Sequence, residues 1–179
     1  KVKPINIIRA GGLQYLTSGS VSAATLDIAL TSYTGYRGLK LLLRMIPATD
    51  GVSLYCRFST DGGSNYLNSG YNWGFFGTFD GGTNVVAGNG NDAQIILTSN
   101  GANQLVGNAS NEGIHCEVNI LAQTSAAYWS RIWVLGHYIS NFSTPQGVVF
   151  NSGGSKETAQ DTDGIQFLFN SGNVNQYAL

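Results

Sequence analysis

Apolar and polar residues alternate in several short segments of this chain. The alternation is clearest in residues 24–33, 36–46, 52–60, 113–123, 127–140 and 164–169. A period of two residues is typical of a β-strand with one buried face, so these six segments are predicted strands. The leucine-rich run 36–46 is also compatible with a helix. The turns that flank it closely, and the strands predicted around it, favour a strand.

Strong turn signals follow two of these segments, 36–46 and 52–60. The sequence PATDG at 47–51 follows one strand, and TDGGS at 60–64 follows the next. Each Asp-Gly pair supplies residues that tolerate the positive φ of a tight hairpin turn. The pattern therefore predicts a three-stranded antiparallel meander over residues 36–66.

Residues 113–123 and 127–140 form the second predicted hairpin, joined by a short TSAA link. Both faces of 127–140 are apolar: Ile132 and Val134 lie on one, Trp133 and Leu135 on the other. A strand of this kind is usually central in its sheet and covered on both sides. We therefore expect this segment to be a covered central strand.

The remaining segments complete an all-β pattern. Residues 93–98, 147–150 and 174–179 are predicted short strands, 67–91 one or two irregular strands with a long loop, and 99–112 and 153–163 polar loops. Many short strands at close spacing predict an antiparallel β-sandwich, jelly-roll-like, with two packed sheets and long Gly/Asn-rich loops. Residues 1–20 are predicted to form an N-terminal arm or edge strands, and 21–179 a single sandwich domain. The apolar arm residues Ile5, Ile7 and Ile8 are candidate subunit contacts.

Charge excludes two classes of partner. Only 11% of the 179 residues are charged, and the net charge is -1. A chain of this composition lacks the basic surface with which proteins bind nucleic acid or anionic lipid. It also lacks a run of about 20 apolar residues, so membrane insertion is not expected. Its neutral polar surface, rich in Gly, Asn and Ser, is typical of virion and adhesin domains.

The cysteines and histidines do not form an obvious reactive or metal site. Cys56 and Cys116 lie in the middle of predicted strands, where a buried small apolar residue is the favoured interpretation. A disulfide between them would require neighbouring strands. His115 and His137 lie on one hairpin, and two histidines are too few for the usual three or more protein ligands of a zinc ion. We expect surface or interface histidines, no metal and no cofactor.

The acidic residues occur mostly beside Gly, Asn or Thr, where a carboxylate bonds its own turn. The sequence STDGGSNY at 59–66 is similar to the Asp-box of sialidase-type hairpins, with Tyr66 in place of tryptophan. In that motif the Asp61 position is structural. Glycoside hydrolysis needs two carboxylates across one cleft, and no such pair stands out. We therefore expect a protein that is not an enzyme and has no catalytic residues.

A cluster of aromatic residues among glycines, 71–79, is the main candidate ligand site. Tyr71 and Trp73, with Asp80 nearby, would hold a glycan by placing a sugar ring on an aromatic face and its hydroxyls on polar groups. The alternative is that these rings fill the core or a contact with another subunit.

Three blocks of sequence, 36–73, 111–140 and 164–179, resemble a β-rich domain of structural proteins of tailed bacteriophages, of the fibre or head-surface type. The closest matches are RFSTDGG at 57–63 and the strand and turn at 164–173. The resemblance implies a non-enzymatic virion protein on the particle surface, with fibre or receptor-binding attachment first and capsid decoration or cementing second. A carbohydrate-binding module is the alternative from another class.

The partners implied are other copies of the chain in a trimer or symmetric array, other virion proteins and a host surface glycan. No catalytic residue carries over from the resemblance.

Overall fold

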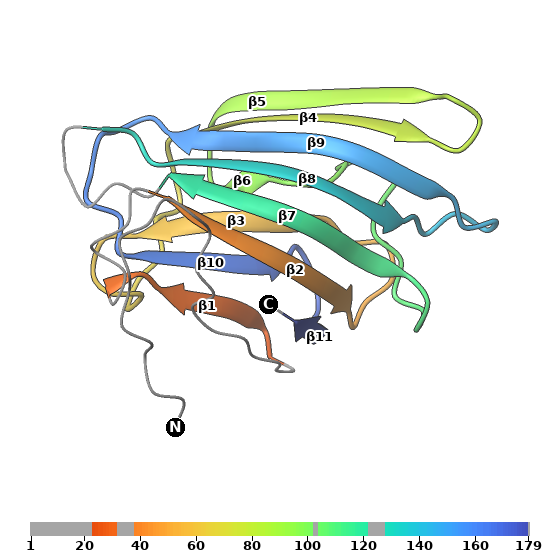
Figure 1. The fold of residues 1–179 in the computed structure, drawn as a ribbon, viewed down its shortest axis with the longest axis horizontal. Helices are drawn as coiled ribbons and strands as arrows, with labels where there is room; N and C mark the ends of the chain where they lie inside the picture. The colour runs from red at the N-terminus through yellow and green to blue at the C-terminus, as the bar shows by residue number, and fades with distance from the viewer. Residues whose placement is uncertain (1–22, 32–37, 102–103, 122–127, 179) are drawn as a thin grey trace, which may run out of the picture.

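The computed structural model describes residues 23–31, 38–101, 104–121 and 128–178, in which eleven strands form two antiparallel sheets (Figure 1). The strands are β1 Thr25–Ala29, β2 Leu39–Pro47, β3 Leu54–Ser59, β4 Tyr71–Phe79, β5 Asn84–Asp92, β6 Ile95–Ile96, β7 Gly113–Leu121, β8 Arg131–Ile139, β9 Gly147–Lys156, β10 Gly164–Phe169 and β11 Val174–Ala178. Among the described residues no helix is long and apolar enough to cross a membrane.

The two sheets differ in size. The small sheet has the order β1-β10-β3-β6, and the large sheet has the order β11-β2-β7-β8-β9-β4-β5. They lie as two layers, with the small sheet against one face of the large one (Figure 1). The predicted β-sandwich is confirmed. The candidate contacts Ile5, Ile7 and Ile8, with the whole predicted arm 1–20, lie outside the described residues.

The core lies between the two layers. Its largest fully buried side chains include Tyr71, Tyr138, Phe58 and Phe167. Burial of each large apolar side chain contributes about 1.5–3 kcal/mol to folding. The faces predicted from alternation are those that turn inward, as in β3, where Leu54 and Cys56 are buried.

The predicted meander over residues 36–66 is wrong. β2 and β4 belong to the large sheet, whereas β3 between them belongs to the small one. The turns at 47–51 and 60–64 reverse the chain but carry it from one layer to the other. The neighbours of β2 are instead β11 and β7, which come from distant parts of the chain. Turn residues set the local backbone, whereas the burial of each strand's apolar face selects its lateral partner.

The second hairpin is confirmed, and β4 and β5 form one that was not predicted. β7 and β8 pair without a register shift from Gly113 to Leu121. The β4–β5 turn contains Gly81 and Gly82, both at a φ near +84°; the backbone there is left-handed, which favours glycine. β9 extends to Lys156, beyond the predicted end at 150, so residues 153–156 form strand rather than loop.

The turn after β3 has the structural role predicted for the Asp-box. One carboxylate oxygen of Asp61 accepts the Asn65 backbone N–H at 2.8 Å, and the other accepts the Asn65 side-chain amide at 2.7 Å. The Ser59 hydroxyl accepts the Gly63 N–H at 2.9 Å. These bonds lower the pKa of Asp61, with the Asn65 amide as the largest cause. Asp61 therefore caps its own turn.

Cys56 and Cys116 lie in opposite sheets, on β3 and β7, and both are buried free thiols. The interpretation as small core residues is confirmed. The two strands are not neighbours, so the requirement for a disulfide is not met.

Candidate functional site

The predicted glycan site at Tyr71 and Trp73 is wrong, because both rings belong to the core. Tyr71 is fully buried, and its hydroxyl accepts the Phe58 N–H at 2.9 Å and donates to the Leu67 carbonyl at 3.2 Å. Trp73 is 7% exposed, and its indole N–H donates to Asp92 at 3.0 Å. Neither ring face is open to a ligand. The alternative interpretation, in which the cluster fills the core, is confirmed for these two residues.

Asp80 does not join Tyr71 in a site. It follows the last residue of β4, whereas Tyr71 is the first, so the two lie about 30 Å apart along an extended strand. The Asp80 carboxylate accepts the Gly147 N–H at 2.9 Å. This bond ties the β4–β5 turn to the start of β9.

Three further carboxylates also bond within the fold. Glu117 pairs with Lys40 at 2.7 Å, Glu112 accepts the Ala109 N–H at 2.8 Å, and Asp27 accepts the side-chain amide of Gln166 at 3.0 Å. Such bonds hold turns and neighbouring strands together. These three carboxylates act as structural acceptors. Glu112 bonds its own turn, as its position beside Gly113 predicted, whereas Glu117 and Asp27 lie on strands.

The outer face of the large sheet is the most unusual surface of the molecule. This is the face turned away from the small sheet. A continuous cross-strand row on it runs from Leu42 through Glu117, Leu135, Asn151 and Phe76 to Val86. The four apolar members of this row are all exposed. Monomeric soluble proteins rarely expose contiguous apolar surface, and such patches usually mark interaction sites.

β8 runs through the centre of this face. The sequence predicted that β8 would be covered on both sides, but in the described part of the chain only one side is covered. It is the fourth of seven strands, so its predicted central position is confirmed. Ile132 and Val134 are buried against the small sheet, whereas Trp133 and Leu135 point outward and are exposed. Among the described residues, the small sheet is the only layer that covers the large sheet, and it lies on one side of it. The second apolar face of β8 is therefore available for a partner.

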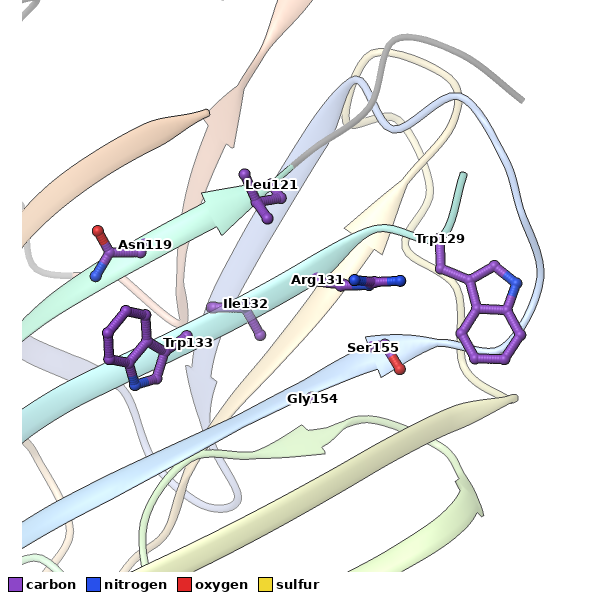
Figure 2. A pocket seen from close by; sticks show the side chains of 8 residues that line it. All are labelled: Asn119, Leu121, Trp129, Arg131, Ile132, Trp133, Gly154 and Ser155. Atoms are coloured by element: carbon purple, nitrogen blue, oxygen red, sulfur yellow. The ribbon is translucent and has the colours of Figure 1, made fainter. Parts of the chain in front are cut away.

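A hollow of about 450 Å³ lies at the start of β8 on this face. We call it the tryptophan hollow; it is lined by Asn119, Leu121, Trp129, Arg131, Ile132, Trp133, Gly154 and Ser155. Figure 2 shows Arg131 between the two indoles, with Asn119 and Leu121 on the β7 side and Ser155 on the β9 side. Trp129, Arg131 and Trp133 alternate along the chain, and this spacing places them on one side of an extended backbone.

Hydrogen bonds orient two of the lining groups. The Trp133 indole N–H donates to Asn151 at 3.0 Å, although 51% of the residue is exposed. The Asn119 amide donates to Glu117 at 3.0 Å. The Lys40 ammonium, and after it Asn119, lowers the pKa of Glu117 and keeps it in the ionised acceptor form. Arg131 forms no ion pair with a carboxylate in the described part of the chain.

The two histidines lie further along the same face. His115 and His137 are direct cross-strand partners, and Arg44 is the next residue in their row. Partial burial, then the charge of Arg44 and then His137, lowers the pKa of His115. Across residues 23–31, 38–101, 104–121 and 128–178, no three His, Cys, Asp or Glu side chains gather as metal ligands. The prediction of surface histidines is confirmed.

Sequence reasoning missed Trp129, Arg131 and Trp133 as site residues. Their signal was the segment WSRIW at 129–133, in which a charged residue lies between two tryptophans on the same face of a strand. A face built only for the core would exclude the arginine.

Two aromatic surfaces, one guanidinium and one amide can stack on a ligand and donate hydrogen bonds to it. With the Ser155 hydroxyl beside them, these groups form an arrangement that is suited to binding. No family model, curated protein or solved structure matches the chain.

Proposed function

We propose that this chain is a non-enzymatic structural domain of a tailed-bacteriophage virion, displayed on the particle surface, where it takes part in host attachment. The observation that carries the proposal is the exposed apolar and aromatic outer face of the large sheet. A rigid sandwich with one open, side-chain-rich face is suited to binding. The similarity of 57–63 and 164–173 to phage structural domains supports the virion context.

The size of the outer face supports a specific contact. Trp129, Trp133 and Phe76 each leave roughly half of their surface uncovered, which amounts to about 100 Å² per ring. With Leu42, Leu135 and the other exposed aliphatic residues, the apolar area reaches several hundred Å², against about 800 Å² per partner in a standard interface. The face therefore supplies much of the area that one binding partner requires.

Capsid decoration is the second proposal within the same class. It is favoured by the Leu42-to-Val86 row, which crosses six strands and presents four exposed apolar side chains that a neighbouring subunit would cover. Other copies of the chain, in a trimer or symmetric array, and other virion proteins are the proposed protein partners.

Antibodies raised against the recombinant chain test the location. They should label intact particles in electron micrographs and lower the rate of adsorption to host cells. Label on the head with normal adsorption would favour decoration over attachment. Particles that carry no label while the same antibodies recognise the purified chain would contradict the virion proposal.

Native mass spectrometry tests self-association of the 179-residue chain. A multiple of 19.0 kDa is expected. Leu135→Asp should shift the mass toward the monomer, because it replaces one of the four exposed apolar side chains of the row with a charge. A matched substitution at an exposed turn residue, Asn111→Asp, should leave the mass unchanged. A monomeric mass for the unaltered chain at micromolar concentration would count against self-association.

A further inference from the structure

We propose that the tryptophan hollow binds an oligosaccharide, which lies along the start of β8 with sugar rings against Trp129 and Trp133. The inference rests on the proposed attachment function and names the ligand class of the outer face. It moves the carbohydrate contact from the buried rings of β4 to the opposite side of the large sheet.

The lining of the hollow matches the chemistry of a sugar. A pyranose ring has an apolar C–H face and a rim of hydroxyl groups, so its site needs flat aromatic surface beside polar donors and acceptors. Trp129 is 44% exposed and Trp133 is 51% exposed, so both offer ring surface. Arg131 lies between them, and Asn119 and Ser155 lie at the two sides (Figure 2).

The groups of the hollow are held before a ligand arrives. The bond from the Trp133 indole N–H to Asn151 fixes one edge of this ring, and the bond from Asn119 to Glu117 directs the amide. Side chains that are already ordered lose less entropy on binding, at about 0.5–1.5 kcal/mol for each long side chain that need not be immobilised. An exposed tryptophan held in this way is a preformed stacking surface.

The spacing of the two tryptophans sets the ligand length. Trp133 follows Trp129 by four positions, so their Cα atoms can lie at most about 14 Å apart in an extended chain. Arg131 occupies the midpoint of this span (Figure 2). A single sugar ring is too short to cover both indoles and the arginine. The ligand class is therefore an oligosaccharide or a segment of a polysaccharide.

The charge of the hollow disfavours a second copy of the chain as its occupant. The eight lining residues include Arg131 and no acidic residue. A two-fold contact centred here would bring two Arg131 guanidinium groups together, and like charges across an interface are unfavourable. The same guanidinium would form a two-point bond with a carboxylate on the ligand. Sugars that carry a carboxylate should therefore bind more tightly than neutral ones.

The test uses the full 179-residue chain on an array of oligosaccharides from bacterial surface polysaccharides, with neutral and uronic-acid-containing members. The best binder is then titrated by isothermal calorimetry. Trp129→Ala and Trp133→Ala should each weaken binding by about tenfold or more, as expected when an anchoring aromatic is removed. Arg131→Gln should weaken binding of the acidic sugars more than that of the neutral ones.

The matched control is Tyr128→Ala, which removes an exposed ring that does not line the hollow. Its affinity should equal that of the unaltered chain, and all variants should keep the same unfolding midpoint. An array without any binder would overturn the inference, as would a binder whose affinity is unaffected by both tryptophan substitutions. Loss of self-association in Trp133→Ala without glycan would show a protein contact and overturn it as well. None of these results changes the labelling of particles, so failure here is distinct from failure of the proposed function.

Discussion

Replacing Tyr71 by phenylalanine removes one oxygen atom from the centre of the core. β6 pairs with only Tyr55 and Cys56 of β3, so it ends before it reaches Phe58. The Tyr71 hydroxyl takes the place of a strand partner there, because it accepts the Phe58 N–H at 2.9 Å and donates to the Leu67 carbonyl at 3.2 Å. Phenylalanine keeps the ring but leaves both backbone groups without this partner.

The cost follows from these two bonds. Each contributes about 1 kcal/mol net, and a buried N–H left without a partner costs about 1–3 kcal/mol. We expect Tyr71→Phe to lower the free energy of unfolding by about 2–3 kcal/mol. For a domain of this size a loss of 1 kcal/mol lowers Tm by about 2–4 °C, so the Tm should fall by about 4–12 °C.

Urea unfolding followed by tryptophan fluorescence, with calorimetry for Tm, measures this loss. Two other Tyr→Phe substitutions grade the effect. Tyr138 donates one bond, to the Gln104 carbonyl at 2.8 Å, so its loss should cost about 1 kcal/mol. Tyr128 is 61% exposed, and its change should stay within about 0.5 kcal/mol. If Tyr71→Phe is no more destabilising than Tyr128→Phe, Tyr71 does not have the structural role assigned to it here.

Three further predictions follow from burial and packing. A Cβ on Gly136 would lie 2.6 Å from the Cβ of Cys116, whereas a Cβ on Gly74 would meet nothing within 4 Å. Gly136→Ala should therefore lower the free energy of unfolding, measured in urea, by about 1–3 kcal/mol. An equal effect of Gly74→Ala would contradict this account of the packing. Burial raises the pKa of Cys116 to about 12 and raises the pKa of Cys56 well above its ordinary value. Ellman's reagent should therefore label neither thiol in the native chain and both thiols in guanidinium. Fast labelling of the native chain would refute the burial of the two thiols. Folding lowers the pKa of His115, so the unfolded chain binds this proton more readily. The contribution of His115 to stability is therefore present above about pH 6.5 and is lost as the pH falls below that value. His115→Gln should reduce the dependence of Tm on pH below about 6.5, and an unchanged slope would count against this reasoning.

Local sequence signals were not sufficient to predict which strands pair. The turns after β2 and β3 were recognisable from Asp-Gly pairs, and the structure uses both to reverse the chain. It does not use them to join adjacent strands, because β3 packs in the other layer. A hairpin and a crossing between sheets begin with similar turn residues. Only the competition between all strands for apolar neighbours decides which of the two forms.

Glycine residues made the full length of two strands, β4 and β9, hard to predict from the sequence. β4 and β9 contain Gly74, Gly77, Gly153 and Gly154, and glycine weakens a strand by itself. In the sheet, however, Gly153 and Gly154 occupy places where a Cβ would contact backbone atoms of the neighbouring strand, at 2.5 Å and 2.3 Å. The close approach of strands in the sheet requires glycine at these positions. Such a requirement is absent from the local sequence.

The candidate site illustrates the same limit. The sequence pointed to exposed aromatic residues beside polar ones as a candidate ligand site and selected Tyr71 and Trp73. The alternation within β4 places both rings on the side of the strand that faces the core, and both are buried in the structure. Trp133 is as aromatic as these two residues, and it lies on a strand whose two faces are both apolar. The sequence could not show which of the two faces is exposed, because that depends on where the small sheet lies.

The sequence by itself determined the class of fold, the inward face of most strands and the structural use of Asp61, because a period of two and the conformation of a turn depend on neighbours along the chain. The tertiary structure decided the partners of each strand and the exposure of Trp129, Arg131 and Trp133. The physical reason is that, in the described part of the chain, the four strands of the small sheet cover one side of the seven-stranded sheet and leave the other side uncovered. The apolar face left outside is the surface available for binding.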